Sequence, residues 1–266
     1  MQNSTLKRLE KAGEIAQSAG RLAVNYFAKR GHLTIDNKGL QDRVTEADQA
    51  VEQLIFEQIT AAFPEDGFLG EETSPDRPTK LVDKGTWVVD PIDGTDCFIY
   101  GMPNWCISIA WVQHGKPTVG VIYDPVHDEL FSAAIGQGAK VNGNSMKVSD
   151  TTELAGGMTG MGYSTRVEST TILVPLQRLI KGGGMFNRTG SAALSLAWVA
   201  DGRLIAYYEP HLNSWDCLAG IVLVREAGGR VNNFLAGDGL TNGNPILACA
   251  PGIADKMEIV SQLEVD

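Results

Sequence analysis

The chain has 266 residues and a mass of 28.6 kDa, a size for which we expect one compact body with two subdomains. Hydrophobic residues make up 43% and charged residues 20% of the sequence, which excludes an intrinsically disordered chain. The formal net charge of -10 argues against a nucleic-acid partner, because binding to phosphate backbones needs clustered lysines and arginines. The net negative charge has two explanations: it keeps the protein soluble, or it comes from carboxylates that gather to bind divalent cations.

The sequence shows no segment typical of membrane insertion or export. The apolar run from Trp105 to Val112 is too short and too interrupted to span a bilayer, and residues 1–21 lack the apolar stretch of a signal peptide. The four cysteines, at positions 97, 106, 217 and 249, have neither the spacing of a zinc site nor the density of a disulfide framework. We therefore expect a cytoplasmic protein with reduced, buried cysteines.

Two helices are predicted first. Apolar residues recur at helical spacing from Leu6 to Phe27, and Gly31 follows as a stop signal. A second helix is expected from Thr45 to Phe63, with Thr45 as the N-cap and Asp48 three residues later.

Strands follow these helices. Residues 87–90, 106–113, 118–123 and 130–134 are β-rich, and His114-Gly115 and Asn142-Gly143 are hairpin signals, so an antiparallel meander is predicted. Beyond about residue 145, helices are expected at 170–181, 191–200 and 215–227, with a strand at 204–209. We predict an N-terminal α+β subdomain (1–144) that carries most metal ligands and a C-terminal α/β subdomain (145–266) that completes the active site.

The string Asp-Pro-Ile-Asp-Gly-Thr, residues 90–95, is the most informative stretch. A strand is expected to deliver Asp90 at its end, Pro91 to stop strand pairing, and the following turn to let Asp93 face the same point. Gly94 allows a ligand to approach the backbone closely, and N–H groups at the start of a helical turn would face an anion. Two carboxylates beside an anion cradle suit a metal-bridged phosphate.

The spacing within this string also separates two classes of phosphatase. Phosphatases with a covalent aspartyl intermediate resemble Asp-x-Asp, whereas Ile92 stands two residues after Asp90. Direct attack by water is therefore the favoured interpretation.

Two further acidic motifs have a structural and a functional interpretation. Gly70-Glu71-Glu72-Thr73 follows an apolar pair and supplies either solvated surface acids or metal ligands. Asp216 lies in the first turn of a predicted apolar helix, where it could cap the helix, complement the helix dipole or bind a metal.

Taken together, these segments resemble the inositol monophosphatase family, within the wider group of lithium-sensitive, magnesium-dependent sugar phosphatases. The resemblance implies an αβαβα layered sandwich of the inositol monophosphatase and fructose-1,6-bisphosphatase type. It covers most of the chain, in the stretches Lys38 to Asp48, Phe68 to Thr73, Trp87 to Ile109, Arg188 to Ala193 and Trp215 to Gly229.

The resemblance also implies two or three Mg²⁺ ions per active site. Glu71, Asp90 and the carbonyl of Ile92 would hold the first ion, while Asp90, Asp93 and Asp216 would hold the second. Such oxygen ligands suit Mg²⁺. In the family the ions polarise the phosphoryl group, activate water and stabilise the departing alkoxide.

Further roles follow from the same resemblance. Thr95, paired with Asp48, and Glu71 would position the attacking water, and the N–H groups of Gly94 and Thr95 would hold phosphate. Contacts to the substrate are expected from Asp93, Asp216, Gly190, Ser191, Ala192 and Glu209. Pro210 is expected to end the strand that precedes it, so Glu209 should emerge at a loop near the start of the helix that carries Asp216. The sequence departs from the family string at Cys97, which replaces the usual Asn and leaves the metal ligands untouched.

The expected activity is hydrolysis of a small phosphate monoester, with inositol monophosphate first and histidinol phosphate second. A nucleotide 3′-phosphatase is third, because few basic residues flank the candidate pocket segments. A regulatory binding module on the same fold is the non-enzymatic alternative. The family further implies a homodimer and sensitivity to Li⁺.

Overall fold

The computed structural model describes residues 2–39, 42–72 and 84–266. Thr73 and residues 40–41, which belong to two of the family-like stretches, lie outside the described residues. In chain order the helices are α1 (Gln2–Ala28), α2 (Glu46–Ala62), α3 (Thr95–Tyr100), α4 (Thr170–Lys181), α5 (Ala192–Ala200), α6 (Ser214–Glu226), α7 (Gly239–Asn242) and α8 (Ala254–Ser261).

The strands form two large sheets and one small ribbon. The small ribbon pairs β1 (Ile35–Gly39) with β2 (Asp42–Thr45). A 7-stranded sheet has the order β3-β4-β5-β6-β7-β8-β9, and a 5-stranded sheet has the order β11-β10-β12-β14-β13. Their strands are β3 (Gly67–Gly70), β4 (Thr86–Asp93), β5 (Cys106–Gln113), β6 (Lys116–Asp124), β7 (Glu129–Ala134), β8 (Ala139–Val141), β9 (Asn144–Ser145), β10 (Met158–Met161), β11 (Met185–Asn187), β12 (Ala206–Leu212), β13 (Arg230–Val231) and β14 (Asn244–Cys249).

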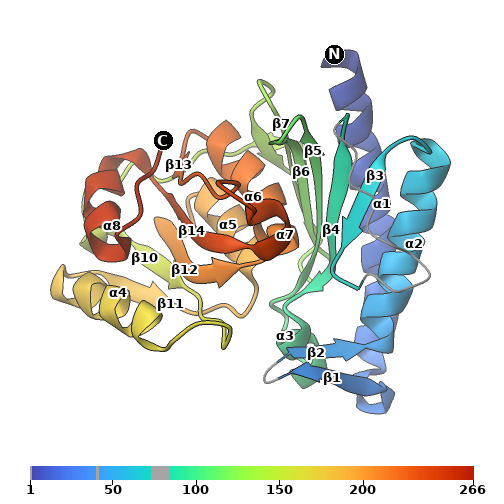
Figure 1. The fold of residues 1–266 in the computed structure, drawn as a ribbon, viewed down its shortest axis with the longest axis horizontal. Helices are drawn as coiled ribbons and strands as arrows, with labels where there is room; N and C mark the ends of the chain where they lie inside the picture. Colours follow the sequence, from blue (N-terminus) through green and yellow to red (C-terminus); the bar gives the residue numbers. More distant parts are fainter. Residues whose placement is uncertain (1, 40–41, 73–83) are drawn as a thin grey trace.

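These elements stack in five alternating layers, which confirms the predicted αβαβα sandwich (Figure 1). Helices α1 and α2 cover one face of the 7-stranded sheet, and α5 and α6 lie between the two sheets. Helices α4 and α8 cover the outer face of the 5-stranded sheet. The division of the chain after residue 144 stays a prediction.

The middle layer explains the composition of its helices. Every residue of α5 except Trp198 is buried, because the helix packs between two sheets. Helix α6 approaches β6 closely: a Cβ added to Gly120 would lie 2.3 Å from the carbonyl oxygen of Ala219. A glycine at this position therefore lets a strand and a helix pack backbone to backbone.

Local sequence signals predicted the N-terminal half well. Thr45 caps α2 and forms a capping box with Asp48, as expected. Strands β4 to β9 form the antiparallel meander, and His114-Gly115 and Asn142-Gly143 turn with positive φ angles at all four residues.

Two prolines do not end their strands, which corrects the prediction. Strand β4 continues through Pro91 to Asp93, and β12 continues through Pro210 to Leu212. In each strand the pairing register shifts once, between the residue before the proline and the residue two positions after it. A bulge leaves the proline out of the hydrogen-bond ladder, so its missing N–H costs nothing there.

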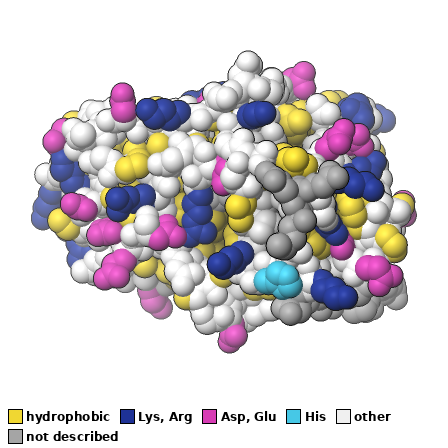
Figure 2. Space-filling view, turned by 90° about the horizontal axis from the view of Figure 1, so that it is seen from above, with side chains coloured by type: hydrophobic (Ala, Val, Ile, Leu, Met, Phe, Trp, Pro, Cys, Tyr) yellow, Lys and Arg dark blue, Asp and Glu magenta, His cyan; other side chains and the backbone are white. Residues whose placement is uncertain are grey.

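All four cysteines are free and buried, as predicted. Among the described helices, none has both the length and the apolarity needed to cross a membrane. Figure 2 shows acidic and basic side chains interspersed over one face of the molecule.

Candidate active site

Three carboxylates converge where β4 meets the start of α6. Oxygens of Asp90, Asp93 and Asp216 all lie within 4.8 Å of one another. The bulge at Pro91 turns the end of β4 so that both of its aspartates reach this point. Asp216 arrives as the third residue of α6, where its Oδ2 accepts a hydrogen bond from the N–H of Asn213 at 2.8 Å. The structure thus brings three of the four predicted carboxylate ligands together.

The electrostatics of this cluster fit a divalent cation. Burial raises the pKa of Asp93 to about 6 and that of Asp216 to about 7. Burial and then the neighbouring carboxylates raise the pKa of Asp90 well above its usual range. Clustered negative charge of this kind is costly without an opposing charge, and carboxylate oxygens are the donors that Mg²⁺ prefers. The residues present therefore fit a metal centre.

Glu71 and Ile92 flank the same cluster. A hydrogen bond with Glu71 contributes to the raised pKa of Asp90, so the two carboxyl groups are in contact. The N–H of Glu71 donates to the carbonyl of Val89 at 3.1 Å, which continues the pairing of β3 with β4. Ile92 is fully buried, and its carbonyl accepts a hydrogen bond from the Thr95 hydroxyl at 3.2 Å.

Asp48 links the start of α2 to Thr95. Its Oδ2 accepts hydrogen bonds from the backbone N–H and the hydroxyl of Thr45, at 2.8 and 2.6 Å, as a capping box requires. Its Oδ1 accepts a longer hydrogen bond from the Thr95 hydroxyl at 3.4 Å. Burial raises the pKa of Asp48 to about 6. One carboxylate therefore caps a helix and faces the hydroxyl predicted to orient water.

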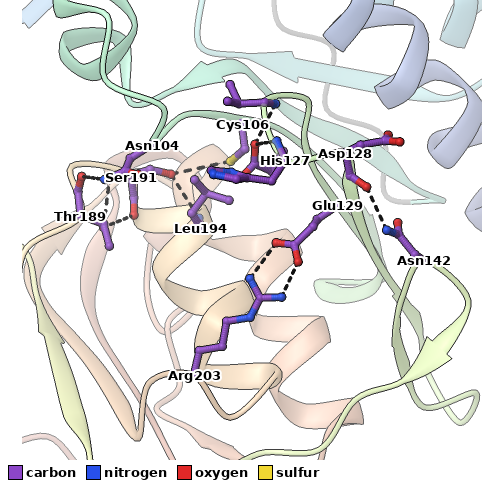
Figure 3. Close-up of polar contacts among 12 residues, drawn as sticks. Asn104, Cys106, His127, Asp128, Glu129, Asn142, Thr189, Ser191, Leu194 and Arg203 are labelled. Atoms are coloured by element: carbon purple, nitrogen blue, oxygen red, sulfur yellow. Dashed lines mark hydrogen bonds and ion pairs between the residues drawn. The ribbon is translucent and has the colours of Figure 1, made fainter.

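Residues at the start of α5 donate hydrogen bonds to Asp93. Asp93 Oδ2 accepts hydrogen bonds from the Ser191 hydroxyl and from the N–H of Ala193, both at 2.6 Å. Ser191 also accepts the N–H of Leu194 at 3.1 Å as the N-cap of α5 (Figure 3). The Ser191 hydroxyl, predicted to contact substrate, is thus bonded to a predicted metal ligand.

The cluster opens into a cleft of about 970 Å³. Of the predicted site residues, all line this cleft except Asp48, Asp90 and Ile92, which are buried. Gly94 precedes α3 with a φ of 102°, and a Cβ there would lie 2.7 Å from the carbonyl oxygen of Asn104. This close approach and the left-handed backbone together require glycine.

Glu209 differs from its prediction in position. It was expected to emerge at a loop beyond the strand, yet it lies within β12, is only 7% exposed and lines the cleft. Its Oε2 accepts a hydrogen bond from the Tyr207 hydroxyl. Burial raises the pKa of Glu209 to about 8. The carboxyl group is therefore a buried part of the cleft wall.

Sequence reasoning did not identify several residues that line the cleft, among them one tyrosine and two arginines. Tyr207 shares a strand face with Glu209, because residues two apart point the same way, and this spacing could have identified it. Arg166 and Arg188 also line the cleft, so two basic side chains border it. Arg188 begins a family-like stretch, two residues before the predicted contact Gly190, and this position could have identified it, whereas no local pattern marks Arg166.

Cys97 packs against the loop before α5. Its thiol donates to the carbonyl of Thr189 at 3.6 Å, and the Asn104 side chain donates to the same oxygen at 3.2 Å. A Cβ at Gly190, whose φ is 92°, would lie 2.5 Å from the Cys97 sulfur. The cysteine therefore borders the predicted substrate contacts.

Comparisons with known proteins agree with this geometry. The sequence model of the inositol monophosphatase family matches residues 5–264. "Inositol monophosphatase 2" of Solanum lycopersicum is 41% identical over 226 residues, which cover 82% of this chain and 84% of the relative. "Nus factor SuhB" of Xylella fastidiosa is 38% identical over 225 residues, which cover 84% of this chain and 80% of the relative.

The fold is also similar to that of a solved structure. The extragenic suppressor protein suhB from Bartonella henselae superposes with a TM-score of 0.89 at 34% identity, and the match covers 96% of this chain and 98% of that one. Because the family match spans nearly the whole sequence and includes the acidic cluster, the chain belongs to the inositol monophosphatase family.

Proposed function

We propose that this protein is a Mg²⁺-dependent phosphomonoesterase that hydrolyses a small alcohol monophosphate, inositol monophosphate first, by direct attack of water. The convergence of Asp90, Asp93 and Asp216 beside a cleft is the observation that carries the proposal. Glu71 and the carbonyl of Ile92 complete the proposed ligand set for two or three ions. When bound, Mg²⁺ would polarise the phosphoryl group and lower the pKa of water.

The protein's own groups supply the remaining steps. The Thr95 hydroxyl, held between Asp48 and the carbonyl of Ile92, is placed to orient the attacking water. Glu71 lies beside Asp90 and lines the cleft, where it can accept a hydrogen bond from the same water. The N–H groups at the start of α3 are proposed to hold the phosphate oxygens.

Residues in the wall of the cleft are proposed to determine which alcohol monophosphate binds. Gly190, Ser191, Ala192 and Glu209 are proposed to contact the alcohol portion of the substrate. The buried Glu209 carboxyl suits either ring hydroxyls or an ammonium group, which supports histidinol phosphate as a second candidate.

The Nus factor names of several relatives support a different class of role, a regulatory binding module on the same fold. Phosphate release from a panel of monoesters, with and without Mg²⁺, separates the two proposals. We expect Mg²⁺-dependent release from at least one monoester and its near loss in Asp93→Asn, because an amide is a poorer metal ligand. Absence of release from every monoester, or unchanged turnover in Asp93→Asn, would overturn the enzymatic assignment.

A homodimer is part of the same proposal. Exposed apolar side chains gather on β10, α4 and β11, at Met158, Leu173, Ile180, Met185 and Phe186. An apolar surface of this kind is typical of an interface between subunits. Sedimentation equilibrium would test it, and a purely monomeric protein would contradict it.

A further inference from the structure

Helix α2 carries a second buried carboxylate one turn after Asp48. Glu52 is 0% exposed and follows Asp48 by four residues, so both side chains lie on the same face of the helix. This face packs toward β4, the strand that carries the candidate metal ligands. Burial of a carboxylate is costly unless its oxygens are hydrogen-bonded.

The carboxylate of Glu52 is bonded to the backbone beside Glu71. Its Oε2 accepts a buried hydrogen bond from the N–H of Glu72, with a nitrogen-to-oxygen distance of 2.8 Å. The residue before Glu71 is Gly70, and a Cβ there would lie 2.3 Å from the same Oε2. The backbone on both sides of Glu71 is therefore in contact with one carboxylate.

We propose that Glu52 is a positioning residue for Glu71, an inference that rests on the proposed role of Glu71 as a metal ligand. The N–H of Glu71 is bonded to Val89, and the next N–H along the chain is bonded to Glu52. Together these bonds set the direction of the Glu71 side chain, which contacts Asp90 and lines the cleft.

The same helix face then serves both groups proposed to position water. Asp48 accepts a hydrogen bond from Thr95, and Glu52 accepts one from the residue after Glu71. Because a helix is rigid over one turn, these two carboxylates fix the position of the segment after β3 relative to the start of α3.

Binding of Mn²⁺ to the metal-stripped full chain, followed by electron paramagnetic resonance, tests this role without requiring turnover. Replacing groups that support a metal ligand typically weakens metal binding by about 10- to 100-fold, and we expect a loss in this range for Glu52→Leu. Glu52→Gln should bind close to wild type, because its amide oxygen can accept the same hydrogen bond. Gly70→Ala should weaken binding, because its Cβ would displace the carboxylate. Glu57→Leu, an exposed position on the same helix, is the matched control.

The outcomes separate the alternatives. Wild-type Mn²⁺ affinity in a Glu52→Leu variant that unfolds at the wild-type temperature would overturn the proposal, and so would a Glu52→Gln variant as weak as Glu52→Leu. If Glu52→Leu does not fold, wild-type affinity in Gly70→Ala would overturn it equally. A wild-type chain that binds no Mn²⁺ would refute the metal site itself, whereas Mn²⁺ binding without phosphate release would refute only the enzymatic function.

Discussion

Removing divalent cations should make the stability of this protein fall as the pH rises. Burial holds the pKa of Asp93 at about 6 and that of Asp216 at about 7, whereas both carboxyls titrate near 3.9 in the unfolded chain. The folded state therefore binds these protons more tightly than the unfolded state. The resulting stability is fully present below about pH 4 and is lost as the pH rises through 6 and 7.

The size of the effect is large for a protein of this length. One pKa unit corresponds to about 1.4 kcal/mol, so the rise of the Asp93 pKa to about 6 corresponds to about 3 kcal/mol of unfolding free energy. Total stabilities are typically about 5–15 kcal/mol. Mg²⁺ bound to the charged carboxylates opposes the loss, by about 2.7 kcal/mol when its concentration is a hundred times the dissociation constant.

Urea unfolding between pH 5 and pH 8, with chelator and then with excess Mg²⁺, measures this dependence. Most of the Asp93 and Asp216 titration falls in this range. Asp93→Asn removes one titrating group and should lose less stability between these pH values, while the exposed Asp238→Asn should behave as wild type. A chelated wild-type protein whose stability changes with pH no more than that of Asp93→Asn would refute the reasoning.

Three further predictions concern single side chains. Thr95→Ala should lower kcat by about a hundredfold or more with little change in KM, because orienting water matters mainly in the transition state; an unchanged kcat in steady-state kinetics contradicts this. Glu209→Gln should leave Mn²⁺ affinity unchanged. Above pH 8, where the Glu209 carboxylate is charged, it should reduce kcat/KM for histidinol phosphate by the equivalent of about 1.5–3 kcal/mol and reduce kcat/KM for inositol monophosphate less. Gly120→Ala should cost about 1–3 kcal/mol of stability by forcing α6 away from β6, and an unchanged thermal unfolding midpoint would argue otherwise.

Features determined by neighbouring residues could be predicted from the sequence. The capping box of α2 depends on Thr45 and Asp48 alone, and each hairpin depends on a two-residue turn. The structure confirms the predicted cap and both predicted turns, because these features need no contact with a distant segment. The order of the five layers came from resemblance to a family and not from periodicity. Local patterns and whole-chain similarity therefore supplied different parts of the architecture.

Features that depend on a partner strand or on distant segments could not be predicted in this way. Pro91 and Pro210 stay within their strands because the pairing strands accommodate bulges, and neither partner is adjacent to the bulge in sequence. The buried position of Glu209 depends on the same pairing. Arg166 reaches the cleft only because the fold brings its segment there.

The acidic cluster joins two layers of the fold at a fixed separation. Asp90 and Asp93 belong to β4 in the 7-stranded sheet, and Asp216 belongs to α6 in the middle layer. The Ser108 hydroxyl of β5 donates to the carbonyl of Trp215 at 3.0 Å, which ties the start of α6 to that sheet. Packing and this hydrogen bond hold α6 in place, so the fold itself brings the three carboxylates together. The free energy gained by burying the apolar side chains of the middle layer offsets the repulsion among the carboxylates. An ion that binds this cluster only in the folded chain would therefore stabilise the junction between the layers.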